Sequence, residues 1–70
     1  MMPLLMASVG ETHKISAVLG NDKIKNHLEN LGFTNNSEIR VVAKNYGNII
    51  VMVKDSRVAI SEDLAKKIMI

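Results

Sequence analysis

The first half of the chain changes its hydrophobic period once. Residues 12–19 alternate between polar and apolar side chains, which is typical of a half-buried β-strand. Apolar residues then recur every three to four positions over residues 24–31, and this spacing predicts a helix of about three turns. Asn21 or Asp22 can cap the start of the helix, and Gly32 is placed where a left-handed residue ends one.

The second half of the chain consists of short apolar segments separated by polar turns. Residues 38–44 alternate in polarity, whereas residues 49–53 are apolar on both faces. Another alternating segment spans residues 58–60, and Ser61 then provides a cap for a short helical turn. The final residues, 68–70, are long enough for one closing strand.

These elements predict an all-β fold class with about five short antiparallel strands. One α-helix is inserted near the start, and a short helical turn lies near the C-terminus. Such a pattern is typical of a small SH3-like β-barrel, since closure removes exposed sheet edges. The links between the later strands are too short for parallel crossovers. We therefore expect a single domain spanning residues 1–70.

Composition narrows the core and excludes several kinds of site. The 70 residues include one Phe, one Tyr and no Trp, so the core is expected to be built from aliphatic side chains. The chain has no cysteine, which excludes disulfides, thiolate zinc sites and a cysteine nucleophile. No nucleophile elbow, metalloprotease motif or phosphate-binding loop is present, so we expect neither an enzyme nor a cofactor.

Charge and hydropathy indicate a cytoplasmic protein that does not bind nucleic acid. Nine basic and seven acidic residues are interleaved to a net charge of +2, without the basic stripe of a nucleic-acid protein. Residues 1–11 lack the basic start and the long apolar stretch of a signal peptide. No segment is long and apolar enough for direct membrane insertion.

Four polar residues between two apolar runs pose a choice between a ligand site and a turn. Lys54, Asp55, Ser56 and Arg57 supply the charges of a phosphate or metal site. A phosphate site also needs glycines or a helix N-terminus, and neither is present here. The sequence favours a hairpin with Asp55-Ser56 as its two-residue connection and with Lys54 facing Arg57 across the strand ends.

Two histidines are the weak candidates for a metal site. His13 and His27 could bind ferrous iron or zinc together with a carboxylate, and Glu11 and Glu29 are their sequence neighbours. Nothing in the spacing brings His13 and His27 together, because one is predicted on a strand and the other on the flank of the helix. We therefore expect surface histidines.

Residues 49–53 are more apolar than a strand with only one buried face requires. If residues 49–53 place alternate side chains in the core, Ile50 and Met52 point outward, and Val42 lies on a neighbouring outward face. An exposed apolar patch usually marks a partner site. The alternative is that the N-terminal residues 4–6 or the helix cover the patch, and the sequence leaves both open.

The order of these segments resembles the FeoA family, ferrous iron transport protein A. The resemblance covers nearly the whole chain and rests on five segments: PLLMASVGE (3–11), HLENLGF (27–33), SEIRVV (37–42), GNIIVMVKDSRVAI (47–60) and LAKKIMI (64–70). Asn36 replaces a glycine common in the family, but asparagine also tolerates the left-handed conformation.

The resemblance implies a bacterial, cytoplasmic SH3-like domain that accompanies FeoB, the membrane permease for ferrous iron. It implies action by protein–protein contact. We expect Val42, Ile50 and Met52 to dock on that partner, with Lys54 and Arg57 orienting it from the rim. The same barrel forms the C-terminal domain of iron-dependent repressors of the DtxR type, so an interaction domain related to that one is an alternative function. A metal sensor or chaperone is a second alternative. The apolar face could also pair with itself in a homo-oligomer.

Overall fold

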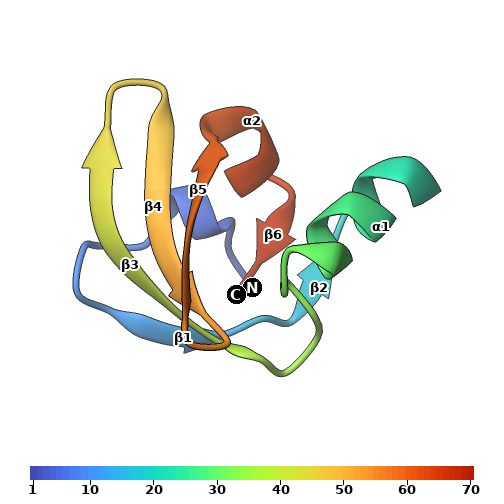
Figure 1. The fold of residues 1–70 in the computed structure, drawn as a ribbon, viewed down its shortest axis with the longest axis horizontal. Coiled ribbons are helices and arrows are strands. Elements are labelled where there is room, and N and C mark those ends of the chain that lie inside the picture. Colours follow the sequence, from blue (N-terminus) through green and yellow to red (C-terminus); the bar gives the residue numbers. More distant parts are fainter.

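A computed structural model describes all 70 residues and contains six strands, two α-helices and one 3₁₀ helix (Figure 1). In chain order the elements are η1 (Leu4–Met6), β1 (Thr12–Lys14), β2 (Ala17–Val18), α1 (Asp22–Asn30), β3 (Glu38–Asn45), β4 (Asn48–Val53), β5 (Ser56–Ser61), α2 (Glu62–Ala65) and β6 (Ile68–Met69).

The strands form two antiparallel sheets. The larger sheet has four strands in the order β1-β3-β4-β5, and the smaller one pairs β2 with β6. Tight turns join β3 to β4 and β4 to β5, and β3 and β4 are the long central strands (Figure 1). The mostly antiparallel β architecture with small helices is confirmed. Its closure into a barrel stays a prediction.

The predicted single strand over residues 12–19 is wrong, because the chain changes partner in the middle of it. β1 pairs with β3, and β2 pairs with β6. Between them the Ile15 N–H donates to the Ser37 carbonyl at 3.0 Å, and the Ser16 N–H donates to the Met69 carbonyl at 2.8 Å. This switch links the two sheets. It also leaves Leu19 47% exposed, although Leu19 continues the alternation of Ile15 and Ala17.

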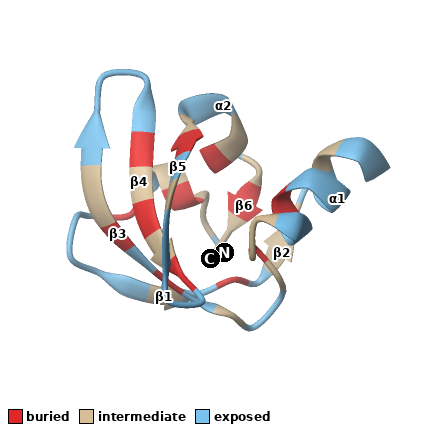
Figure 2. Ribbon diagram, viewed as in Figure 1, coloured by how far each residue is buried: buried red, intermediate tan, exposed pale blue.

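The core lies between the two sheets and the helices, and it is aliphatic apart from one ring. Figure 2 shows the buried positions alternating along β4 and further buried positions on α2 and β6. The 13 buried residues are Leu4, Ala7, Ile15, Leu28, Phe33, Ile39, Val41, Ile49, Val51, Val53, Ile60, Ala65 and Ile68. The aliphatic prediction is confirmed, with Phe33 as the exception.

The helix predicted over residues 24–31 is confirmed, as are both of its end signals. The Asn21 side chain accepts a hydrogen bond from the Ile24 N–H at 2.9 Å, which satisfies one free donor of the first turn. At the other end Gly32 has φ +107. The Phe33 N–H donates to the Leu28 carbonyl at 3.0 Å, and both side chains are buried, as in a Schellman motif.

The C-terminal segment also follows the sequence pattern. The Ser61 hydroxyl accepts a hydrogen bond from the Leu64 N–H at 3.3 Å and caps α2. Two residues after α2 the chain enters β6, whose Ile68 is fully buried. No helix is both long and apolar enough to cross a membrane.

Candidate partner-binding face

The central strand β4 presents apolar side chains on both sides of the larger sheet. Ile49, Val51 and Val53 are buried, whereas Ile50 and Met52 are half-buried on the opposite side. Figure 2 shows this alternation along β4. The predicted alternation is therefore confirmed, and the outward residues lie outside the core cluster.

Strand register determines which side chains surround Met52 on the outward side. Residues directly opposite each other in antiparallel strands share a face of the sheet. Met52 lies opposite Arg40 of β3 and opposite Arg57 of β5. One row further along, Ile50 lies opposite Ala59 of β5. We call this surface the outward face, and its members are Arg40, Val42, Ala43, Ile50, Met52, Arg57 and Ala59.

A β-bulge brings Val42 into this face. The β3–β4 register shifts between Val41 and Ala43, so Val42 is an extra residue on β3 and Ala43 takes the position opposite Ile50. Val42 is half-buried there. The predicted proximity of Val42 to Ile50 thus follows from a feature that the alternating pattern did not reveal.

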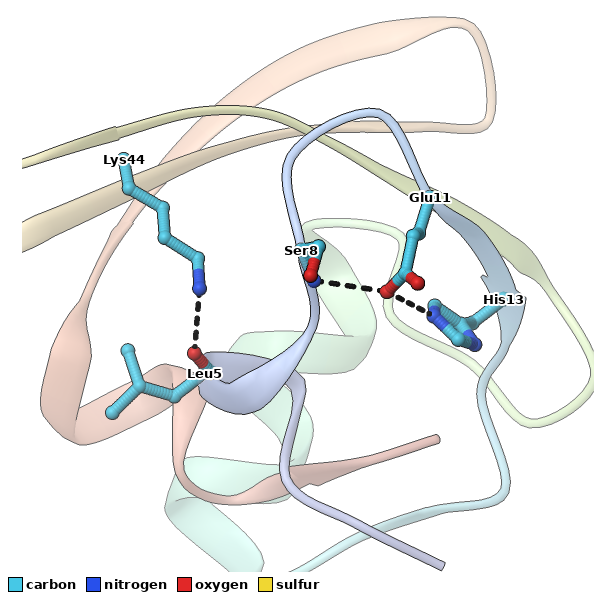
Figure 3. A network of polar contacts seen from close by, with 5 residues as sticks. All are labelled: Leu5, Ser8, Glu11, His13 and Lys44. Atoms are coloured by element: carbon cyan, nitrogen blue, oxygen red, sulfur yellow. Dashed lines mark hydrogen bonds and ion pairs between the residues drawn. The ribbon is translucent and has the colours of Figure 1, made fainter.

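The same bulge turns Lys44 toward the other side of β3. Lys44 lies opposite the buried Ile49, and its Nζ donates a hydrogen bond to the Leu5 carbonyl at 3.0 Å (Figure 3). This contact holds the end of η1 against the sheet. The bulge therefore joins β3 to the N-terminal segment while leaving the outward face open.

Neither of the segments that the sequence allowed as a cover lies on the outward face. Leu4 is fully buried, and Leu5 of η1 packs against the core cluster. The apolar side of α1, represented by Ile24 and Leu31, also packs against that cluster. Figure 1 shows α1 and α2 on the inner side of the four-stranded sheet. The alternative of a covered patch is therefore wrong for these two segments.

The hairpin prediction is correct in kind but displaced by one residue. The two-residue loop is Lys54-Asp55, because Val53 pairs with Ser56. Lys54 and Asp55 have φ values of +49 and +63, as a type I′ turn requires. Arg57 therefore lies opposite Met52, and the predicted pairing of Lys54 with Arg57 is wrong.

An open hollow of about 570 Å³ adjoins Met52 on the outward side. It is lined by Thr12, Ser37, Glu38, Ile39, Arg40, Met52, Lys54 and Asp55. Two of the five predicted partner-binding residues thus line it, whereas Val42, Ile50 and Arg57 do not. Sequence reasoning missed Arg40, although its position two residues before Val42 on an alternating strand was a usable signal.

The positive charges around Met52 have no acidic partners within the protein. The only ion pair in the structure joins Glu11 to His13, so the guanidinium groups of Arg40 and Arg57 are unpaired. Both side chains belong to exposed residues. The outward face therefore combines a half-buried apolar centre with two unpaired cations, which is suited to an apolar surface that carries carboxylates.

The candidate metal ligands are separated into two places. Glu11 Oε1 lies 3.2 Å from His13 Nε2 and also accepts the Ser8 N–H at 2.9 Å (Figure 3). His27 and Glu29 are exposed residues of α1. No three side chains of His, Cys, Asp or Glu lie close enough together to hold a metal ion.

The Glu11 contacts predict a pH-dependent stability. The Ser8 hydrogen bond and His13 hold the pKa of Glu11 below its ordinary value of 4.5. A carboxyl whose folded pKa is lowered stabilises the fold above its unfolded pKa, and this contribution disappears as the pH falls through the folded value. Between pH 6 and pH 3 the melting temperature of the wild type should therefore fall more than that of Glu11→Gln. Equal losses in the two proteins would contradict the assigned role.

Comparison with known proteins assigns the chain to a family. A model of the FeoA domain matches residues 2–70. The chain belongs to the FeoA family. Among the curated proteins compared, none matches it.

Two solved FeoA structures support the assignment. An iron uptake regulatory protein (FeoA) is 28% identical over 96% of this chain and 89% of its own, with a TM-score of 0.87. Stenotrophomonas maltophilia FeoA, solved with zinc and described as an SH3 domain protein, is 28% identical over 99% of this chain and 88% of its own, with a TM-score of 0.85. The predicted FeoA resemblance and SH3-like fold are confirmed.

The FeoA fold also occurs within larger regulators. A manganese-dependent transcriptional repressor is 20% identical over 94% of this chain, with a TM-score of 0.86, and the match spans 38% of the repressor. At this identity the likeness shows the fold alone. The sequence predicted a relation to iron-dependent repressors of the DtxR type, and the likeness to this manganese-dependent repressor confirms it only as a shared fold.

Proposed function

We propose that this FeoA-family protein is a cytoplasmic accessory protein of ferrous iron uptake that binds the cytoplasmic part of a FeoB-type permease. It acts by contact and not by catalysis. The family supports the iron-uptake context, since one similar structure is an iron uptake regulatory protein and another is described as a candidate activating factor of bacterial ferrous iron transport.

The observation that carries the proposal is the outward face. Val42, Ile50 and Met52 lie on the larger sheet outside the core cluster, and neither η1 nor α1 covers them. Contiguous apolar patches on small proteins usually mark interaction surfaces. A methionine at the centre suits such a surface because its flexible thioether adapts to irregular neighbours.

The charges specify the partner surface further. Arg40 and Arg57 flank Met52 and have no ion pair, while Lys54 lines the adjoining hollow. A complementary partner places an apolar side chain over Met52 and carboxylates beside the arginines. The charges at the rim then raise the association rate and orient the partner, and they add less to the affinity.

A titration of the protein with the cytoplasmic part of the permease from the same organism tests the proposal. We expect saturable binding, with an association rate that falls as salt is raised from 50 to 500 mM, because screening weakens the arginine contacts. A single-stranded oligonucleotide of similar charge serves as the control and should not bind specifically. Absence of binding to the permease at protein concentrations of 100 µM would contradict the proposal.

A metal-binding role is the second candidate, and one observation favours it. The S. maltophilia relative was solved with zinc. In this chain Glu11 Oε1 and His13 Nε2, which lie 3.2 Å apart, are two potential metal ligands. Calorimetry with ferrous iron under anaerobic conditions separates the two candidates. The docking role predicts no specific uptake by the isolated protein, whereas stoichiometric binding that His13→Ala abolishes would favour the metal role.

A further inference from the structure

β5 has a free edge with unpaired peptide groups. It is the last strand of the sheet, so only β4 pairs with it. Hydrogen-bonded pairs alternate along antiparallel strands. The Glu62 N–H donates to the Gly47 carbonyl at 3.2 Å, so Glu62 and Gly47 form a hydrogen-bonded pair in the register that also pairs Val53 with Ser56. Every second residue of β5 counted back from Glu62 therefore bonds to β4. The N–H and C=O groups of Arg57 and Ala59, which fall between these pairs, therefore point away from β4.

This edge has only one of the features by which proteins usually protect an edge strand, the charged side chain of Arg57. Prolines, bulges and inward-pointing charges are the other common devices. β5 is six residues long, contains no proline, and pairs with β4 without a register shift. Its inward residues include Val58 and Ile60, which carry no charge. The opposite edge strand, β1, offers only three residues.

We propose that the partner supplies an extended acidic segment that pairs with β5 as a fifth strand of the larger sheet. This inference rests on the proposed function, since the added strand would continue the outward face. Addition of a strand to a sheet edge gives affinity through main-chain hydrogen bonds and specificity through alternate side chains. The unpaired N–H and C=O groups of Arg57 and Ala59 lie two residues apart, which is the spacing at which an added strand forms its main-chain hydrogen bonds.

The charge of the segment follows from the side chains beside the edge. The Arg57 side chain is exposed, has no ion pair and shares the outward face with Arg40. An outward carboxylate on the added strand lies next to Arg57, where a charge-assisted hydrogen bond is stronger than a neutral one. The small side chain of Ala59 leaves room for a larger apolar residue two positions along the added strand.

A second copy of this chain fits the edge less well. Two β5 strands could pair in antiparallel fashion about Val58. Each Arg57 would then lie opposite Ala59 of the second copy. The two arginines would share one face of the sheet as diagonal neighbours. Diagonal neighbours are only about 7 to 8 Å apart, so the two charges repel. The only acidic residue of the hairpin, Asp55, lies in the turn and not in the strand. An acidic segment removes the repulsion that a second copy creates.

Two substitutions of Ala59 distinguish the contribution of its backbone N–H from that of its side chain. Ala59→Pro removes an N–H that β4 does not use, and proline is tolerated on edge strands. We expect Ala59→Pro to weaken binding to the permease's cytoplasmic part about tenfold, as for loss of one hydrogen bond to a strand. The control Ala59→Ser also changes the side chain but keeps the N–H, so it should bind more tightly than Ala59→Pro. Equal affinities for Ala59→Pro and Ala59→Ser would overturn the inference.

Amide hydrogen exchange tests the same edge without a variant. The Arg57 and Ala59 amides should exchange quickly in the isolated protein and at least tenfold more slowly in the saturated complex. If Met52→Asp disrupts the complex but the Arg57 and Ala59 amides remain unprotected in the wild-type complex, strand addition is overturned and docking on the outward face is retained. Protection in the isolated protein that grows with its concentration would assign the edge to a second copy. If the wild type binds and neither Met52→Asp nor Ala59→Pro changes the affinity, both the outward face and the β5 edge are excluded as the contact surface, whereas absence of wild-type binding would overturn the proposed function itself.

Discussion

Met52→Asp is expected to weaken binding to the permease's cytoplasmic part by about 100-fold or more. Met52 is half-buried between Arg40 and Arg57 at the centre of the outward face. Truncation of a hot-spot residue near the centre of an interface costs about 2 kcal/mol or more, and each 1.4 kcal/mol is a factor of ten in affinity. An aspartate at this position also carries a charge that a closed apolar contact would strip of water.

The fold should tolerate this change, because Met52 lies outside the core cluster. The melting temperature of Met52→Asp therefore serves as its first control. Leu19→Asp is the matched control, since Leu19 is an exposed aliphatic residue that follows β2 in the other sheet. Unchanged affinity of folded Met52→Asp, or an equal loss in Leu19→Asp, would contradict the placement of the site.

Phe33→Ala is expected to lower the free energy of unfolding by about 3 to 5 kcal/mol. Phe33 is 1% exposed and follows Gly32 at the end of α1, where its N–H bonds to the Leu28 carbonyl. Loss of a buried phenylalanine side chain costs about 3 to 5 kcal/mol. A protein of this size has a free energy of unfolding of about 4 to 10 kcal/mol, so the loss removes a large part of it.

The only other aromatic residue provides a matched control for Phe33. Tyr46 is fully exposed at the turn between β3 and β4, so Tyr46→Ala should change the free energy of unfolding by less than about 0.5 kcal/mol. Phe33→Leu keeps most of the apolar volume and should lose about 1 to 1.5 kcal/mol. Urea titrations of the three variants measure these differences. A similar loss in Phe33→Ala and Tyr46→Ala would contradict the packing.

Local signals in the sequence predict much of this fold. The helical spacing around Leu28 and the glycine at position 32 locate α1, and the apolar run of residues 49–53 locates the central strand. These predictions succeed because the hydrophobic period reports which side of an element is buried. Capping adds to it, since Asn21 and Ser61 each accept a bond from the backbone N–H three residues later.

Features that depend on long-range pairing are not visible in the same signals. The alternation through Ile15 and Ser16 continues although the chain leaves β3 there and joins β6. Period alone cannot show a change of partner, because Ile15 points inward in either sheet. The turn was misplaced by one residue for a related reason: Lys54 and Asp55 both adopt positive φ without a glycine to indicate it.

The candidate site was predictable in its apolar part and less so in its charged part. Outward positions for Ile50 and Met52 follow from the period of two along β4. The arginine pair around Met52 depends on the register of three strands, which the sequence does not specify. The spacing of Arg40 from Val42 could have placed it on the outward face, but its position opposite Met52 could not be predicted, and the structure gives Arg57 a different neighbour from the one predicted.

Mapping of the contact surface by NMR tests the central claim most directly. ¹⁵N-labelled protein is titrated with the permease's cytoplasmic part while backbone amide shifts are followed. The account predicts that the largest changes fall on Arg40, Val42, Ile50, Met52 and Arg57, while α1 and the η1 segment stay unchanged. Binding that shifts α1 or η1 and leaves the outward face unperturbed would contradict it.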